Sequence, residues 1–144
     1  MKTLAISGGD LVVGQTGHAT ISGAPKIRQD LALALQEPIG NDRFHLDWGS
    51  VLPEYIGMPI TDETDVLVKA EVGRVLQQYM AVQQRDILQD STDGQKTRYA
   101  TSDVVQQVVE IQASVHFDTV DISVSLLTAA GKRVTVKRTV NLSG

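Results

Sequence analysis

A chain of 144 residues, 42% of them hydrophobic, is the right size for one globular domain with a single core. The lack of cysteine excludes disulfides, thiolate metal sites and a thiol nucleophile. The net charge of −4 disfavours nucleic-acid binding, and no apolar run approaches the roughly 18 residues that span a bilayer. We therefore expect no nucleic-acid partner and no membrane partner. The first residues also lack the apolar run of a secretory signal.

Residues 1–23 are rich in Gly, Ser and Thr and contain three short β-prone pieces separated by glycines. Such spacing is typical of a small hairpin-like segment, with one turn expected at Gly8-Gly9. The pieces are Leu4-Ala5-Ile6, Leu11-Val12-Val13 and Ala19-Thr20-Ile21.

A first helix is predicted from Ala24 onward, because Ile27, Leu31 and Leu35 recur every four residues. The charged residues between them are expected on the solvent-facing sides. The helix should end near Gln36, since a residue that precedes a proline is disfavoured in the helical conformation.

Residues 38–60 contain three of the six aromatic residues, together with several glycines and prolines. We expect a long ordered loop in which the aromatic residues form a small packed core, because aromatic groups bury large areas. An alternative is a platform for a ligand. The structural motif of this loop consists of Gly40, Phe44, Trp48, Gly49, Tyr55 and Gly57.

A second, longer helix is predicted from about Glu63 to near Gln89, where apolar residues alternate at spacings of four and three. Three carboxylates at its start suit the positive end of the helix dipole. Gly73 lies inside it and suggests close packing against another backbone. Turn-forming residues from Asp90 to Gly94 should end the helix, and a polar loop should follow.

From residue 104 the hydrophobic period becomes two, which predicts antiparallel strands. The apolar residues of the first strand run from Val109 to Phe117, and two further strands follow with short connections. Helices before strands predict an α+β fold, with two main helices packed on a three-stranded C-terminal meander. We expect one domain over 1–144, made of the β-prone segment 1–23, the helical part 24–89 and the sheet 104–144.

No pattern of catalytic or metal-binding residues is evident. His18, His45 and His116 have no metal-ligand spacing. A glycoside hydrolase needs two carboxyl groups across the scissile bond, and the loop could supply them, although each has a simpler role in turns or caps. These carboxylates are Glu37, Asp42, Asp47 and Glu54. We predict no enzyme activity, no metal and no cofactor.

The order of motifs between about residues 21 and 60 resembles the baseplate-wedge family of contractile phage tails, sometimes labelled lysozyme-like and related to type VI secretion baseplate subunits. The Glu-Pro-Arg tripeptide often found in that family after the second helix is absent, and Tyr79-Met80-Ala81 and Gln83-Gln84-Arg85 stand in its place. The motifs are Ile21-Ser22-Gly23, Lys26 to Leu31, Pro38 to Phe44, Asp47 to Leu52 and Tyr55 to Ile60.

The resemblance implies a structural subunit of the tail baseplate, assembled in the host cytoplasm. Its expected partners are other wedge proteins, which form a helical bundle, and the tail sheath protein, whose first ring would attach to it. Several copies in a six-fold arrangement are expected. A type VI secretion baseplate subunit is one alternative, and a lysozyme-like peptidoglycan hydrolase is another, of a different class.

A three-stranded meander leaves an edge with unpaired backbone groups, onto which a strand from a neighbour can add. The last strand is our first choice for this docking edge. The predicted protein-interface residues are Val134, Val136, Arg138, Val140, Tyr79 and Arg85.

Overall fold

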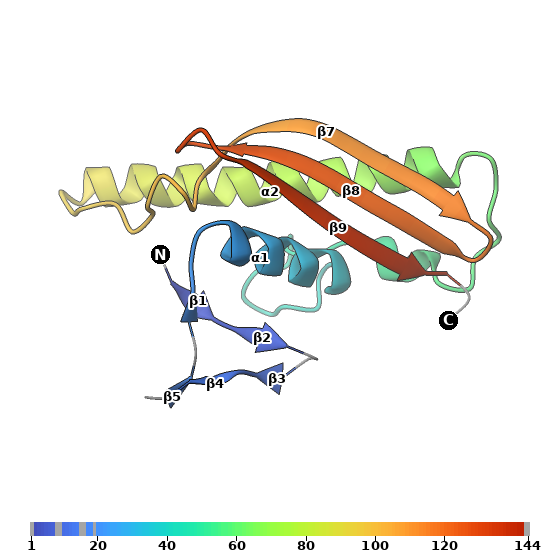
Figure 1. Ribbon diagram of the computed structural model, residues 1–144, viewed down its shortest axis with the longest axis horizontal. Coiled ribbons are helices and arrows are strands. Elements are labelled where there is room, and N and C mark those ends of the chain that lie inside the picture. The colour runs from blue at the N-terminus through green and yellow to red at the C-terminus, as the bar shows by residue number, and fades with distance from the viewer. Residues whose placement is uncertain (1, 8–9, 15–16, 19, 143–144) are drawn as a thin grey trace.

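The computed structural model, which describes residues 2–7, 10–14, 17–18 and 20–142, has two layers. Two helices lie on one face of a three-stranded antiparallel sheet, and a thin β-ribbon lies beside the first helix (Figure 1). The predicted α+β class is confirmed. In the described part of the chain, no helix is long and apolar enough to cross a membrane.

Helix α1 spans Ala24–Gln36, as predicted. Pro25 fits its first turn, where a missing N–H breaks no helical bond. At the other end Glu37 is already extended, as expected for a residue that precedes Pro38. The helix turns its apolar side towards the sheet, where Ile27 and Leu31 are almost completely buried.

Helix α2 spans Thr64–Thr92, so the predicted end near Gln89 is three residues too early. The turn-forming residues continue the helix because Asp90 is held in place: its carboxylate accepts bonds from the backbone N–H and the guanidinium of Arg98. The prediction for Gly73 is also wrong in detail. A Cβ there would meet the Ile111 side chain at 3.6 Å, and not a neighbouring backbone.

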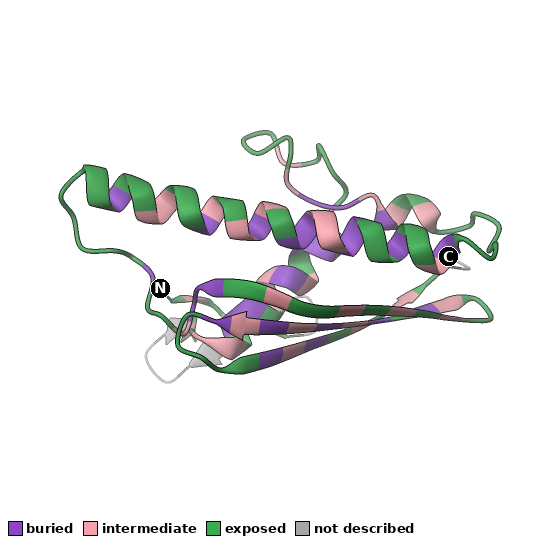
Figure 2. Ribbon diagram, turned by 90° about the horizontal axis from the view of Figure 1, so that it is seen from above, coloured by how far each residue is buried: buried purple, intermediate pink, exposed green. Residues whose placement is uncertain are grey.

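The sheet consists of β7 (Val105–His116), β8 (Thr119–Thr128) and β9 (Arg133–Asn141) in the order β7-β8-β9. This is the predicted meander. One face packs on both helices, so more buried and less buried residues alternate along β8 and β9 (Figure 2). The buried strand residues of this core are Val105, Val120, Ile122, Val124, Leu126, Val134 and Val136.

Strand β7 does not follow a simple period of two, because it contains two register shifts. Val108 pairs with Leu126, and Glu110 pairs with the adjacent Ser125. Val109 therefore has no partner in β8 and is an extra, bulged residue, which is 47% exposed. Phe117 lies in the β7–β8 turn with a φ of 53° and is 98% exposed. The predicted burial of both residues is therefore wrong.

The N-terminal segment forms an antiparallel ribbon, in agreement with the predicted β-prone segment. Strand β1 (Thr3–Leu4) pairs with β6 (Thr20–Ile21), β2 (Ile6–Ser7) with β3 (Asp10–Leu11), and β4 (Val13–Gly14) with β5 (Gly17–His18). The turn predicted at Gly8-Gly9 lies outside the described residues. The ribbon is tied to α1 by Gln29, whose side chain accepts from the N–H of Ile6 at 2.8 Å and donates to the carbonyl of Leu4 at 2.7 Å.

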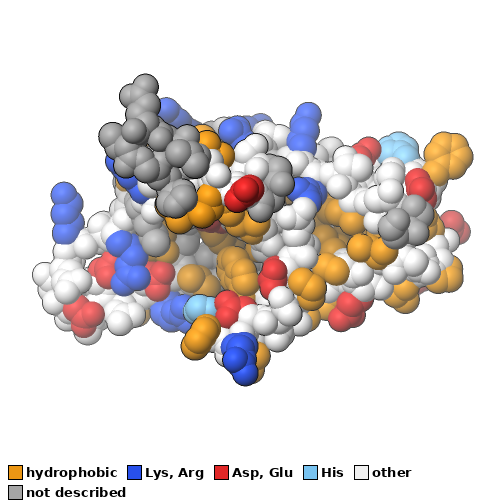
Figure 3. Space-filling model, turned by 90° about the horizontal axis from the view of Figure 1, so that it is seen from below, with side chains coloured by type: hydrophobic (Ala, Val, Ile, Leu, Met, Phe, Trp, Pro, Cys, Tyr) orange, Lys and Arg blue, Asp and Glu red, His pale blue; other side chains and the backbone are white. Residues whose placement is uncertain are grey.

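The long loop between the helices is ordered around a short 3-10 helix, η1 (Leu52–Tyr55). Its aromatic residues do not form one cluster. Trp48 and Tyr55 are half-buried against the main core, whereas Phe44 is 88% exposed. The predicted packed mini-core is therefore wrong for Phe44. Figure 3 shows the molecule from below, where hydrophobic side chains reach the surface among charged ones.

Candidate functional site

The outer edge of β9 is the candidate site. β9 pairs with β8 along its whole length in unbroken register, and no strand in the described ranges pairs with its other side. The Nε of Arg28, on α1, donates to the carbonyl of Thr135 at 3.0 Å, so this carbonyl points away from β8. Because hydrogen-bonding direction alternates along an antiparallel strand, the backbone groups of Thr135, Lys137 and Thr139 face outward. An added strand would pair with these groups.

A groove of about 780 Å³ runs beside this edge. It is lined by residues of β9, of α1 and of the N-terminal ribbon. Figure 1 shows how these three elements are arranged. The apolar part of its lining includes Leu33 of α1, 40% exposed, and Ile6 of the ribbon. A second groove of about 230 Å³ continues along β9 to Asn141, and Arg138 lines both. Together they border the outer edge from Val136 onward.

The charges on these grooves all have one sign. Arg28, Lys137 and Arg138 line them, and no carboxylate of the described residues does. Among the described residues, none of the three cations forms an ion pair with an acidic side chain. The edge is therefore basic although the chain as a whole has a net charge of −4.

Arg28 is a site residue that the sequence analysis missed. The helical pattern placed it on the solvent-facing side of α1, and it is indeed exposed. Its partner, Thr135, is 107 positions further along the chain, so no local signal could connect them.

The structure separates the predicted interface residues into three groups. The side chains of Val134 and Val136 are 1% and 5% exposed, so a partner cannot contact them. What β9 offers a partner is the outward backbone N–H and C=O groups of the residues next to them. Arg138 and Val140 are half-buried at the groove. Tyr79 and Arg85 lie on α2, away from the β9 edge, and their interface role rests on the family resemblance alone.

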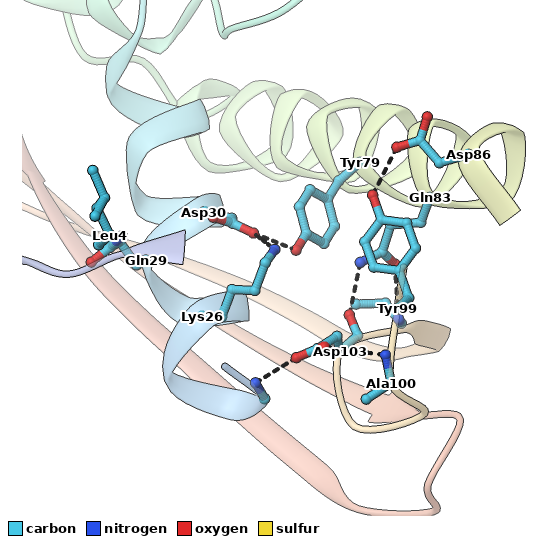
Figure 4. Close-up of polar contacts among 12 residues, drawn as sticks. Leu4, Lys26, Gln29, Asp30, Tyr79, Gln83, Asp86, Tyr99, Ala100 and Asp103 are labelled. Atoms are coloured by element: carbon cyan, nitrogen blue, oxygen red, sulfur yellow. Dashed lines mark hydrogen bonds and ion pairs between the residues drawn. The ribbon is translucent and has the colours of Figure 1, made fainter. Parts of the chain in front are cut away.

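Tyr79 is engaged inside the chain. Its hydroxyl donates to Asp30 at 2.8 Å, and the same carboxylate pairs with Lys26 (Figure 4). Burial, reinforced by the Asp30 charge, raises the pKa of Tyr79 far above its usual value, so the hydroxyl stays protonated. The side chain is 5% exposed and is not accessible to a partner. Instead, it fixes α1 against α2.

A second polar group fixes the start of α1 and the start of β7. The carboxylate of Asp103 accepts from the backbone N–H groups of Gly23 at 2.5 Å and Ala100 at 3.3 Å. The Gln83 amide bonds to the Asp103 carbonyl and to the N–H of Val105 (Figure 4). Burial would raise the pKa of Asp103, but the hydrogen bonds that its carboxylate accepts, those from Gly23 and Ala100 among them, outweigh burial and lower that pKa. Helix α1, which borders the groove, and strand β7 are thus rigidly placed.

The loop motif holds the backbone of the long loop in its observed path. Gly40, Gly49 and Gly57 all have positive φ. At Gly49 a Cβ would lie 2.6 Å from the Glu37 carbonyl oxygen, so no other residue fits. The guanidinium of Arg74 donates to the Gly49 carbonyl at 2.8 Å and pairs with Glu71 at 2.7 Å, which ties the loop to α2.

The four candidate carboxylates of a hydrolase are placed as follows. Glu37 accepts from Asn41 and Asp47 from Gln78, while Glu54 is exposed in η1. Asp42 accepts from the N–H of Phe44 and from His45, and these bonds lower its pKa, opposite to what a general acid requires.

The two histidines whose side chains the structure describes do not come together at a metal site. His45 bonds to Asp42, and His116 lies 3.8 Å from Asp121 on the exposed face of the sheet. The side chain of His18 lies outside the described part of the structure. Within that part, no group of three or more His, Cys, Asp or Glu side chains could hold a metal ion.

Comparison with known proteins gives one structural likeness. No family model matches the chain, and no curated protein does. The chain is similar in structure to a crystal structure from Geobacter sulfurreducens described as a "putative tail lysozyme". The TM-score is 0.58 with 15% sequence identity, over 86% of this chain and 96% of the other. At that identity the likeness shows a shared fold.

Proposed function

We propose that this chain is a structural subunit of a contractile phage-type tail, located in the baseplate wedge, and that it is not an enzyme. The observation that carries the proposal is the open, basic edge of β9 with its bordering groove. The shared fold with a protein named for a phage tail supports the tail context.

Assembly would proceed by strand addition at β9. A neighbouring subunit, which we propose to be the tail sheath protein, would place an extended segment in the groove and pair with Thr135, Lys137 and Thr139. Backbone pairing supplies affinity in this mode, and the groove selects side chains. The exposed face of α2, where Arg85 lies, remains for the other wedge proteins.

Incorporation into particles tests this function. Lys137→Pro removes an outward N–H without removing a bond to β8, whereas Lys137→Ala removes the same charge and keeps the N–H. We expect both variants to fold, and only the alanine variant to be present in tail particles purified from producing cells. If the wild-type chain is absent from such particles, or if the proline variant enters them equally well, docking at β9 is wrong.

The name of the structurally similar protein keeps a peptidoglycan hydrolase as a second candidate. A zymogram containing peptidoglycan distinguishes the two. We expect no clearing by the purified chain. Clearing that disappears in Glu37→Gln or Glu54→Gln would establish the enzymatic alternative and assign it to the loop carboxylates.

A type VI secretion baseplate subunit is an alternative of the same structural kind. Neighbouring genes decide between the two systems. Genes for tail sheath, tube and fibres would support a phage tail or a tailocin, and genes for a secretion membrane complex would support the other system.

A further inference from the structure

The β9 edge carries two arginines in positions that oppose strand addition. Arg28 occupies the outward carbonyl of Thr135, which an incoming strand needs as an acceptor. Arg138 lies on the apolar phase of β9, directly opposite Ile122 of β8, and is half-buried. Inward-pointing charges on an edge strand are a known protection against unspecific pairing.

We infer that Arg28 and Arg138 make the β9 groove selective for an extended, acidic protein segment that presents both carboxylates and apolar side chains on the strand face turned towards α1. This inference rests on the proposed docking at β9 and names the chemistry of the segment that docks there.

The geometry explains why both kinds of side chain are needed on that face. Arg28 acts at Thr135, and Arg138 is three residues further on, about 10 Å along the strand. A strand paired with the outward groups of β9 would direct every second side chain towards α1. There it would meet Leu33 and Ala32 as well as the two guanidinium groups. Apolar and acidic side chains are both needed to match this lining.

Charge explains the selectivity. A neutral strand must displace Arg28 from Thr135 and enclose the guanidinium of Arg138 without a partner, and both steps are unfavourable. A carboxylate can accept two parallel bonds from a guanidinium, so an acidic strand replaces the bond that Arg28 loses and pairs with Arg138. The arginines therefore weaken the binding of a neutral strand and strengthen the binding of an acidic strand.

The observations favour protein over nucleic acid as the anionic partner. The groove is lined by three cations on an apolar surface, and the chain around it is acidic overall. Nucleic-acid binding gains its affinity from many Lys and Arg contacts to phosphates.

The test uses fluorescent peptides of about nine residues, the length of β9. The residues at every second position, which together form one face of the strand, are alternately valine and one of Glu, Gln or Lys, and the residues between them are threonine. Binding to the full chain is followed by fluorescence anisotropy. We expect the Glu peptide to bind about tenfold more tightly than the Gln peptide, and the Lys peptide not to bind. N-methylation of alternate peptide backbone nitrogens should abolish binding, as required for strand pairing.

The decisive variant is the double substitution Arg28→Gln and Arg138→Gln. We expect it to bind the Gln peptide more tightly than wild type does, so that the preference for Glu falls to about threefold or less. The matched control is Arg43→Gln with Lys96→Gln, which removes the same charge from loops outside the groove and should keep the wild-type preference. Thermal unfolding checks that every variant is folded.

Each remaining outcome overturns the inference in a recognisable way. Equal binding of the Glu and Gln peptides to wild type leaves docking intact and removes the selectivity. If the double variant loses affinity for the Glu peptide and gains none for the Gln peptide, the arginines attract acidic segments but do not exclude neutral ones. Binding of an oligothymidylate as tight as that of the Glu peptide indicates a site for polyanions in general. If no peptide binds wild type or the variant, docking at β9 is itself wrong.

Discussion

The two edges of the sheet differ in how their unpaired backbone is protected. Strand β7, 12 residues long, contains two register shifts, so Gln106 and Val109 have no residue opposite them in β8. Strand β9 has nine residues in unbroken register. Irregular backbone prevents a regular ladder on β7, whereas β9 keeps one and is protected by the side chains of Arg28 and Arg138.

This difference is the reason that we propose docking at β9 and not at β7. A bulge is built into the covalent length of the strand and no partner can remove it. An arginine can be displaced or paired by the right partner, because side chains change rotamer without unfolding the sheet. The following predictions test this contrast, starting with the largest expected effect.

Proline should distinguish the two sides of β9. Arg138→Pro removes an N–H that points to β8 and leaves a carbonyl of β8 unpaired, which costs at least about 1–3 kcal/mol. Lys137→Pro removes an outward N–H and should cost clearly less. Urea unfolding measures both. Equal destabilisation would mean that the alternation inferred from the Arg28 bond is wrong.

Removing a bulge should turn β7 into a second open edge. Deletion of Val109 leaves Val108 and Glu110 opposite Leu126 and Ser125, so the strand becomes regular there and still folds. We expect sedimentation velocity to show concentration-dependent self-association of this variant that is stronger than that of the wild type. Deletion of Ala113, which has a pairing partner, should instead shift the register and destabilise the sheet. A monomeric, folded Val109 deletion would contradict the protective role of the bulge.

The loop next to β9 should respond to pH through Glu71. Burial favours a higher pKa for this carboxyl, but bonds from Arg74 and from the N–H of Val51 outweigh it, so the pKa lies below its ordinary value of 4.5. The ionised group therefore stabilises the fold above about pH 4.5, and this contribution is lost as the pH falls through the lowered pKa.

We expect Glu71→Gln to be less stable than wild type at neutral pH, with the difference narrowing in acid. Urea midpoints between about pH 3 and 7 measure it. A difference that is independent of pH would show that the loss comes from packing and not from the charge.

The smallest effect on stability is expected for Arg28→Gln, within about 0.5 kcal/mol, because the side chain is exposed and its bond to Thr135 is open to water. Thermal unfolding checks this value. A large loss would make Arg28 a structural residue of the sheet and weaken its assignment as a removable protection of the edge.

Much of the fold could be predicted because its signals are local. Pro38 stops α1 through a steric effect on the preceding residue, and the period of two marks β8 and β9 because one face of each strand is buried. The end of α2 was misplaced because Asp90 is fixed by Arg98, which lies in the following loop. The burial of Val109 was misjudged because a bulge changes the face on which each residue lies.

The candidate site could be predicted only in part. The sequence pointed to the last strand as an open edge, because a short meander has few strands to cover its edges. It could not show that Arg28 reaches Thr135, that Leu33 and Ile6 border the same groove, or that Tyr79 is occupied by Asp30.

By itself, then, the sequence determined the order and type of the main elements and one open strand edge, since these follow from hydrophobic period, proline sterics and chain length. Only the tertiary structure decided the character of that edge. The groove, the positive charge and the two arginines at this edge are contributed by α1, β9 and the ribbon. These elements are distant in the sequence, so their residues meet only when the helices pack on the sheet.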